Sequence, residues 1–459
     1  MPTYSYATYG DAITALGSRL YDPTFQQWTQ DELRGYLTEA LRTWNALSGF
    51  WRSEMVFPTV ADTWWYDLRT QPQSLVPYTV TQYELIKQIE NHLLEPPTPD
   101  AWSGSRQFSL QDLLTALRRR QDDTLGTTGC TVTRSTPSAN VGIRTLLADN
   151  VIDILRVAWL PAVGQGYPNK ILRQSDMWAN RAFDPYYTTA AQEPPSTWMQ
   201  NTEPPISFDV DRVPPVPGRW DILSVNAGEA WTAGIDALVS IPDDWTWVFK
   251  WGALMDLLSG ESNAKDTLRA EYCKARYQEG LALLESMPTA LALRMNNIPM
   301  TLDAVRNGDD FNPSWQSAAL TWAEISEHWE DVDFSWAAPE GPPKQGYAAG
   351  NLIAFSPLAA EFSVTVSVCQ NAPVGGTYVQ VARDCFDAVI DYAHHLAMLK
   401  QGGAEFVATI PLYQRFQKKA AQYNSKLKEM GVFEMPQLEL SMAQEQQSPR
   451  YSLGAGPSD

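Results

Sequence analysis

Apolar residues recur at helical spacing early in the chain, each time directly behind a helix-start signal. Thr29-Gln-Asp-Glu32 and Thr81-Gln-Tyr-Glu84 have the capping-box pattern, and Ser109-Leu-Gln-Asp112 is a close variant. In this pattern the hydroxyl oxygen accepts one unpaired backbone N–H of the first turn, and the acid accepts another. Because apolar positions three and four residues apart follow the caps, we expect residues 1–125 to be mostly helical.

Alternating apolar and polar residues indicate β-strands between and after these helices. The stretch Met55–Leu68 has two such runs about a turn, so a β-hairpin is expected there. Cys130–Arg134 and Val151–Leu160 alternate in part, as half-buried strands do. From Asp184 to Gly218 prolines are frequent. Since proline fixes φ and lacks a backbone donor, this last segment is expected to be an extended arm.

The second half of the chain shows a weak internal repeat, in which strands precede a pair of helices. The predicted elements of the first unit are strands at 220–225 and 238–241 and helices at about 243–259 and 264–286. Those of the second unit are strands at 352–355 and 362–368 and helices at about 378–400 and 411–429.

Together these patterns predict an α+β, helix-rich, multi-unit chain with short β-sheets, paired antiparallel helices and an extended Pro-rich arm. The predicted units are a helical N-terminal domain with a β-hairpin (1–125), a β-containing segment with the arm (126–218), two strand-plus-helix-pair units (219–338 and 339–435), and an extended tail (436–459).

Charge and hydropathy narrow the classes of partner. The 459 residues include 34 basic and 53 acidic side chains, which gives a net charge of −19. A chain with this negative charge is repelled by nucleic acid and by anionic membranes. We therefore expect no specific nucleic-acid binding and no membrane partner. Residues 1–17 lack a basic and apolar leader, and the apolar run 245–258 is too short to cross a bilayer. We therefore expect neither a secretory signal nor a membrane span.

No motif gathers the residues that catalysis, a metal ion or a cofactor requires. The cysteines lie far apart without a CxxC pair, which favours reduced core thiols: Cys130, Cys273, Cys369 and Cys385. His394 and His395 are adjacent, so on a helix they point about 100° apart and cannot form a metal-binding pair. We expect no catalytic residue, no metal site and no cofactor.

Paired acidic residues are the feature of the sequence that suggests an alternative, enzymatic function. Two carboxylates beside aromatic rings are what a glycoside hydrolase uses. Acid pairs occur at 122–123, 243–244 and 309–310, and DxD sets at 209–211 and 331–333. However, Asp243 and Asp244 follow Pro242 at a predicted helix start. Negative charge there complements the helix dipole without any catalysis, and we favour that interpretation.

Tryptophan is unusually frequent, at 18 of 459 residues. Such rings can form a sugar-binding platform, but they are also typical of cores and subunit interfaces, because each has an apolar body and one donor. We favour core or interface positions. The candidate interface residues are Trp64, Trp65, Trp245, Trp247 and the prolines of the arm, namely Pro194, Pro195, Pro204, Pro205, Pro214, Pro215 and Pro217.

Two passages support a family resemblance. Residues 28–51, WTQDELRGYLTEALRTWNALSGFW, are followed by a strand ending in Trp65-Tyr66-Asp67-Leu68. In residues 241–284 a proline and acids start one helix, and the run Asp266, Arg269, Ala270 opens the next. The first passage resembles the N-terminal helices, and the second the helix pair after a strand, of tailed-bacteriophage virion proteins of the head–tail adaptor or neck class.

The resemblance implies a non-enzymatic structural virion protein of a phage head–tail connector, neck or tail. Its copies are expected to form a homo-oligomeric ring that contacts portal and tail proteins around the path of the DNA. It is expected to be made in the host cytoplasm and localised in the virion. Surplus carboxylates repel phosphates, which suits a channel that DNA passes through. The alternatives are a carbohydrate-binding or glycan-degrading phage tail protein and a cytoplasmic scaffold unrelated to phage.

Overall fold

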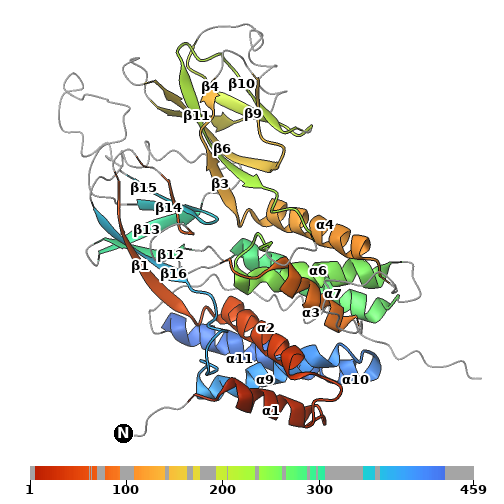
Figure 1. The fold of residues 1–459 in the computed structure, drawn as a ribbon. Helices are drawn as coiled ribbons and strands as arrows, with labels where there is room; N and C mark the ends of the chain where they lie inside the picture. Colours follow the sequence, from red (N-terminus) through yellow and green to blue (C-terminus); the bar gives the residue numbers. More distant parts are fainter. Residues whose placement is uncertain are drawn as a thin grey trace, which may run out of the picture.

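The chain has an α+β fold in which a helical body and three β-sheets follow one another along the molecule (Figure 1). The computed structural model describes residues 6–60, 63, 65–69, 78–93, 108–139, 144–162, 169–175, 193–203, 205–232, 237–260, 265–286, 290–295, 298–304, 345–356 and 362–429. The predicted tail from 436 onward lies outside these residues.

The helical body contains helices from both halves of the chain. These are α1 (Tyr9–Arg19), α2 (Gln30–Ser48), α3 (Gln82–His92), α4 (Leu110–Thr128), α6 (Thr246–Ser259), α7 (Thr267–Ser286), α9 (Arg383–Met398), α10 (Gly403–Ala408) and α11 (Ile410–Glu429), with a 3-10 turn η1 (Asp243–Trp245) before α6. Figure 1 shows α1, α2, α9 and α11 together at the bottom of the body, and α3, α4, α6 and α7 above them.

The predicted capping boxes are confirmed. In α2 the Thr29 hydroxyl accepts the Glu32 backbone N–H at 3.2 Å, and the Glu32 carboxylate accepts the Thr29 N–H at 2.8 Å. The same reciprocal bonds start α3 at Thr81 and α4 at Ser109. A fourth box, Thr8 with Asp11, starts α1. These motifs act within one helical turn, so sequence spacing alone identifies them.

One hydrophobic core joins the helices of three predicted units. It runs from Tyr9 in α1 to Ala420 in α11 and includes Trp44, Trp247 and Tyr392, which are 0%, 1% and 0% exposed. The predicted succession of separate units along the chain is therefore wrong for the helices. Their apolar faces bury more surface by packing on one another than a single helix pair could bury alone.

The two strands predicted at Met55–Leu68 both form, but the prediction that they pair with each other as a hairpin is wrong. A seven-stranded sheet has the order β1-β16-β12-β13-β14-β15-β2, so the two strands of the expected hairpin lie at its opposite edges. Its strands are β1 (Arg52–Pro58), β16 (Ser363–Cys369), β12 (Ala290–Met295), β13 (Ile298–Ala304), β14 (Gln345–Ala349), β15 (Leu352–Ser356) and β2 (Trp65–Asp67). Six residues separate β1 from β2 in the sequence, and Met55 and Tyr66 belong to one apolar cluster.

The remaining sheets contain the predicted middle strands and the described part of the Pro-rich arm. One sheet pairs β3 (Val132–Ser135), β11 (Gly218–Asn226), β6 (Val151–Pro161) and β7 (Lys170–Ile171), with β4 (Ser138–Ala139) also on β11. The other has the order β5 (Arg144–Leu146), β10 (Ser207–Val210), β9 (Thr197–Asn201) and β8 (Arg173–Gln174).

The described part of the arm, residues 193–203 and 205–218, contains extended strands that pair with their own chain. Its strands β9 and β10 pair antiparallel, and Trp198 and Phe208 pack edge to face with ring centroids 6.5 Å apart. Both side chains are buried, at 1% and 0% exposure. Apolar residues between the prolines thus anchor the arm in a local core, which the proline count did not indicate.

Candidate functional site

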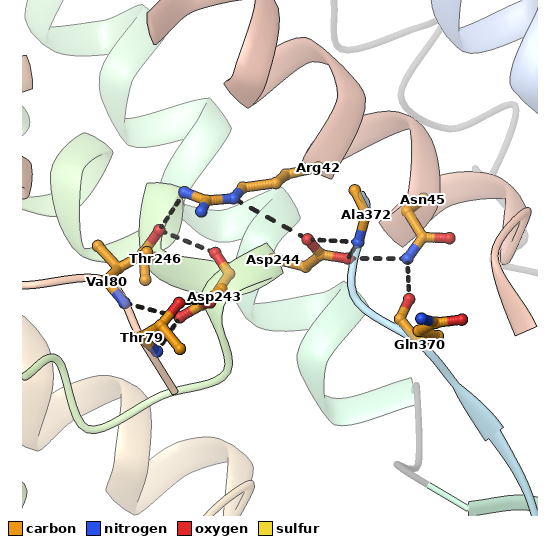
Figure 2. Close-up of polar contacts among 9 residues, drawn as sticks. All are labelled: Arg42, Asn45, Thr79, Val80, Asp243, Asp244, Thr246, Gln370 and Ala372. Carbon is orange, nitrogen blue, oxygen red and sulfur yellow. Dashed lines mark hydrogen bonds and ion pairs between the residues drawn. The ribbon is translucent and has the colours of Figure 1, made fainter. Parts of the chain in front are cut away.

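The acid pair Asp243 and Asp244 lies where three distant parts of the chain meet, and we call it the Asp243–Asp244 junction (Figure 2). The pair occupies η1, directly before α6, and its residues are 5% and 4% exposed. Pro242 provides an extended residue before the turn. The two carboxylates point in different directions, toward different segments of the chain.

Asp243 holds the segment that leads into α3. Its Oδ1 accepts the backbone N–H groups of Thr79 at 2.7 Å and Val80 at 2.9 Å, and its Oδ2 accepts the Thr79 hydroxyl at 2.5 Å. Its own carbonyl accepts the Thr246 hydroxyl at 3.0 Å. A carboxylate that accepts two backbone N–H groups, one of them buried, stabilises the local chain path.

Asp244 joins α2 to the segment that follows β16. Its Oδ2 accepts the Asn45 amide at 2.7 Å and the Ala372 backbone N–H at 2.9 Å, and Arg42 Nε lies 4.0 Å from Oδ1. Asn45 also donates to the Gln370 carbonyl at 2.6 Å. Burial raises the pKa of Asp244 to about 6, even though these donors and Arg42 oppose that change.

The geometry of the junction suits structural linkage and not acid–base catalysis. Both carboxylates are enclosed, and their oxygens are occupied by groups of this chain. A hydrolase needs two carboxyl groups that face each other across a space for the sugar. The helix-dipole role expected from the sequence also understates the pair, because its carboxylates link segments near residues 45, 80 and 372.

A second buried polar cluster links α2, α3 and α6. Lys250 donates to Glu39, and its Nζ lies 3.2 Å from His92 Nε2, while the Trp251 indole donates to the other Glu39 oxygen at 2.9 Å. Lys250, Glu39 and His92 are 1%, 4% and 2% exposed. Burial lowers the pKa values of Lys250 and His92. Sequence reasoning missed this cluster, although a lysine inside the apolar run 245–258 is the signal that could have indicated it.

A third buried cluster surrounds Arg276 of α7. Its guanidinium donates to the Tyr392 hydroxyl at 2.8 Å and to Glu279 and Tyr413, and it lies 4.7 Å from the Trp247 ring centroid. Arg276 is 1% exposed. The cluster therefore joins α7 to α9 and α11 through a charge that is paired and stacked inside the core.

The adjacent histidines of α9 have different environments, as their spacing predicts. His395 is fully buried, with Nδ1 2.8 Å from the Thr409 hydroxyl and Nε2 2.8 Å from the Tyr272 hydroxyl. Burial lowers its pKa to about 3, so its ring is neutral at physiological pH. His394 is only partly buried. Within the described ranges, no group of three or more potential metal ligands comes together.

Other acid pairs also form internal contacts. Asp209 pairs with Arg144 through two bonds of 2.8 and 2.9 Å, and Asp123 accepts the Tyr277 hydroxyl at 2.8 Å. Asp211 accepts the backbone N–H groups of Ser196 and Thr197. The acids at 309–310 and 331–333 lie outside the described residues.

The candidate tryptophans that the structure describes lie inside the chain. Trp65, Trp245 and Trp247 are 5%, 9% and 1% exposed, so they pack within their own subunit and offer no surface to a neighbour or a sugar. The prediction that these three tryptophans are interface residues is therefore wrong, because their side chains are buried in their own chain. Trp245 and Trp247 belong to the core of the helical body, and Trp65 in β2 belongs to an apolar cluster of strand residues. Local sequence reveals neither enclosure. Trp64 lies outside the described residues.

The prolines of the arm have mixed exposure. Pro205 and Pro217 are exposed, Pro194, Pro214 and Pro215 are partly exposed, and Pro195 is buried. Pro204 lies outside the described residues. The exposed prolines flank β10 and β11, so they remain candidates for contact with another chain.

A pocket of about 560 Å³ lies between the helical body and the sheet of β11. Its lining includes Arg69, Tyr78, Thr131, Asn226, Glu229 and Leu238. Arg69 donates two hydrogen bonds to Asp67 Oδ2, at 3.1 and 2.7 Å. None of the buried clusters above lines this pocket.

No protein family model matches this chain, and a search of curated proteins finds no match either. Among the helices in the described ranges, none is both long enough and apolar enough to cross a membrane.

Proposed function

We propose that this chain is a structural subunit of a tailed-bacteriophage virion, part of a head–tail connector, neck or tail ring through which DNA passes. It acts by protein–protein assembly and not by catalysis. Its partners are further copies of itself and the phage portal and tail proteins. The proposal rests on the sequence resemblance of residues 28–51 and 241–284 and on the properties of the described residues.

The observation that best supports the proposal is that the buried ionisable groups connect parts of the chain to one another. The Asp243–Asp244 junction, the Lys250 cluster and the Arg276 cluster each connect helices or segments far apart in the sequence, and none of them faces the pocket. A catalytic centre instead exposes its perturbed groups to a substrate-sized space. Internal linkage of this kind supports a rigid building block that acts through its surface.

The charge of the chain supports a position beside DNA without binding to it. A net charge of −19 disfavours tight contact with phosphates, and surplus carboxylates along a channel repel a passing duplex. The same charge makes copies of the chain repel one another, so their mutual contacts are expected to use uncharged surfaces.

Particle analysis tests this proposal directly. The full-length chain is mixed with the purified portal protein of the phage genome in which it is found, and complexes are examined by negative-stain electron microscopy and mass photometry. Purified virions are analysed by mass spectrometry in parallel. Ring-shaped density on the portal and stoichiometric presence in virions are expected. A chain that neither binds portal nor occurs in purified particles contradicts the proposal.

The glycan alternative is tested by a different measurement. A glycan array and a reducing-sugar assay on host envelope polysaccharide are expected to show neither binding nor cleavage. Its structural motivation is weak in the described residues, because the candidate rings Trp65, Trp245 and Trp247 are enclosed in the core. Genes for portal and capsid proteins beside this gene separate the phage assignment from a cytoplasmic scaffold.

A further inference from the structure

The strand β1 lies at one edge of the seven-stranded sheet, and in the part of the chain that the structure describes it pairs with β16 alone. Two backbone bonds show which of its peptide groups face β16. The Gln370 N–H donates to the Trp51 carbonyl at 3.0 Å, and the Thr59 N–H donates to the Phe362 carbonyl at 2.7 Å. Trp51 and Thr59 therefore direct their peptide groups at β16.

The peptide groups of Glu54 and Val56 point the other way. Residues of an antiparallel strand alternately face the partner strand and the opposite side. Ser53 and Met55 lie an even number of residues from Trp51, so they bond to β16, whereas Glu54 and Val56 direct N–H and C=O outward. Pro58 is the next outward position, and its missing N–H is tolerated because the strand is at an edge.

The outer edge of β1 also carries exposed apolar side chains. Val56 and Val60 are 57% and 56% exposed, and Pro58 between them is exposed as well. Glu54 is paired with Arg294, whose Nη1 lies 3.4 Å away. Native proteins normally cover an edge that combines unpaired backbone groups with exposed apolar side chains, because such an edge pairs with other chains.

The last described helix ends near the start of this edge strand. The Tyr423 ring of α11 lies 5.1 Å from the ring of Phe50 and 6.1 Å from that of Trp44, measured between centroids. Phe50 directly precedes Trp51 and the first residue of β1. Beyond Tyr423, α11 continues to Glu429, which adds about 9 Å at 1.5 Å per residue. The chain after Glu429 therefore starts close to β1.

The chain beyond α11 has the pattern of a half-buried strand. Residues 430–459 lie outside the residues that the structure describes, but in sequence the run Gln437-Leu438-Glu439-Leu440-Ser441-Met442 alternates polar and apolar residues. This period of two is typical of a strand with one apolar face. Pro436 directly before the run interrupts helical continuation. The seven residues 430–436 reach about 24 Å when extended, which is about the length of β1.

We propose that residues 437–443, which we call the tail strand, add to the outer edge of β1 in the same chain. Their backbone pairs with the outward groups of Glu54 and Val56, and their apolar face covers Val56 and Pro58. The same chain is the favoured occupant, because a segment tethered beside its site has an effective concentration in about the millimolar range. The tail strand closes an edge that would otherwise pair with other chains. This inference is independent of the proposed virion function.

Hydrogen exchange at single-residue resolution tests the tail strand in the full-length chain. The Glu54 and Val56 amides are expected to exchange slowly in the wild type, because the tail strand bonds them. The Ser53 and Met55 amides, which bond to β16, are slow with or without the tail strand and report that the sheet is folded. Fast exchange at Glu54 and Val56 in the folded wild type overturns the proposal.

Two matched variants identify the occupant of the edge. The apolar-face variant is Leu438→Ser with Leu440→Ser, and the polar-face control is Gln437→Ser with Glu439→Ser. In the apolar-face variant the outward amides of β1 are expected to exchange about tenfold faster or more, while the control exchanges like the wild type. Equal exchange in the wild type and the apolar-face variant shows that another segment covers the edge, and overturns the proposal.

Cross-linking in a chain with an intact apolar face gives a second test that does not depend on the stability of the variants. A photoreactive phenylalanine analogue is placed at Glu439, and chains with natural and heavy nitrogen are mixed before irradiation. Cross-links to residues 52–60 within one chain are expected. Cross-links to other parts of the chain contradict the tail strand. Cross-links that join light to heavy chains assign the edge to a second copy and overturn the same-chain occupant.

Discussion

Replacement of Asp244 by asparagine is expected to make the helical body more stable at neutral pH and to change how its stability depends on pH. The Asn45 amide and the Ala372 N–H both donate to Asp244 Oδ2, at 2.7 and 2.9 Å. An asparagine oxygen at that position accepts both bonds. The Arg42 Nε at 4.0 Å loses a distant charge partner but remains near the Thr246 hydroxyl, at 3.5 Å.

The magnitude follows from the pKa of Asp244. Burial raises it from 3.8 to about 6, so the folded protein holds this proton more tightly than the unfolded chain. The stabilisation that this tighter proton binding provides is fully present below pH 3.8 and is lost as the pH rises through 6. At 1.36 kcal/mol per pKa unit, the ionised carboxylate lowers the free energy of unfolding by roughly 3 kcal/mol at pH 7. Asparagine does not ionise and avoids this loss.

The assay is urea unfolding monitored by far-UV circular dichroism at fixed pH values between 4 and 8. The quantity of interest is the difference in free energy of unfolding between the variant and the wild type, because titration of all other groups cancels in it. The free energy of unfolding of the variant is expected to gain roughly 2 kcal/mol on that of the wild type between pH 4 and pH 7. The gain is smaller than roughly 3 kcal/mol because the wild type has already lost part of this stability at pH 4.

A control of opposite sign is available in Asp22. Backbone hydrogen bonds from Gln26 and Trp28 lower its pKa, so its contribution is present above pH 3.8 and lost as the pH falls. Asp22→Asn is therefore expected to lose stability relative to the wild type as the pH rises from 3 to 5. If the Asp244→Asn difference is flat with pH, or shifts toward the wild type as the pH rises, the reasoning about burial at the junction is refuted.

Three further substitutions test the internal packing by urea unfolding. Lys250→Met leaves Glu39 buried without its partner and is expected to lower the free energy of unfolding by about 3–5 kcal/mol, and adding Glu39→Gln is expected to restore part of it; a loss below 1 kcal/mol contradicts the buried pair. Thr29→Ala removes the cap of α2 and is expected to cost about 1 kcal/mol; an unchanged midpoint argues against that cap. Gly350→Ala is expected to cost at least about 1–3 kcal/mol, because φ is +54° and a Cβ would lie 2.8 Å from the Gly129 carbonyl. Its control Gly375→Ala, which has open space around it, is expected to be nearly neutral, and equal effects in both variants contradict the steric argument.

Local features of the fold could be predicted from the sequence. The three capping boxes act between residues three apart, and the strands at 151–160 and 352–355 follow from alternation. The helices expected at about 264–286 and 411–429 occur as α7 and α11. The α+β class follows from the same patterns, because each depends only on neighbours in the chain.

Pairing and enclosure could not be predicted in this way. Met55–Leu68 contains two strands, but their partners are β16 and β15, about 300 residues away by sequence number. Trp247 was a candidate interface residue on sequence grounds, yet it is 1% exposed and packs against Arg276 of α7, with 4.7 Å between the guanidinium carbon and the ring centroid. Loop closure over such distances depends on many simultaneous contacts, which no local window of sequence contains.

For the candidate sites, too, local sequence and tertiary structure determined different properties. From sequence alone, Asp243 and Asp244 are negative charges at a helix start, and Lys250 is a lysine within an apolar run. Tertiary structure made the acids a junction of three segments and gave Lys250 its partner Glu39, 211 residues earlier. It also left Tyr21 exposed at the left-handed position of the cap that ends α1. The sequence by itself determined which segments form helices and strands, because those preferences are local. The tertiary structure decided which charges are buried and which rings face solvent, because burial depends on the whole packed chain.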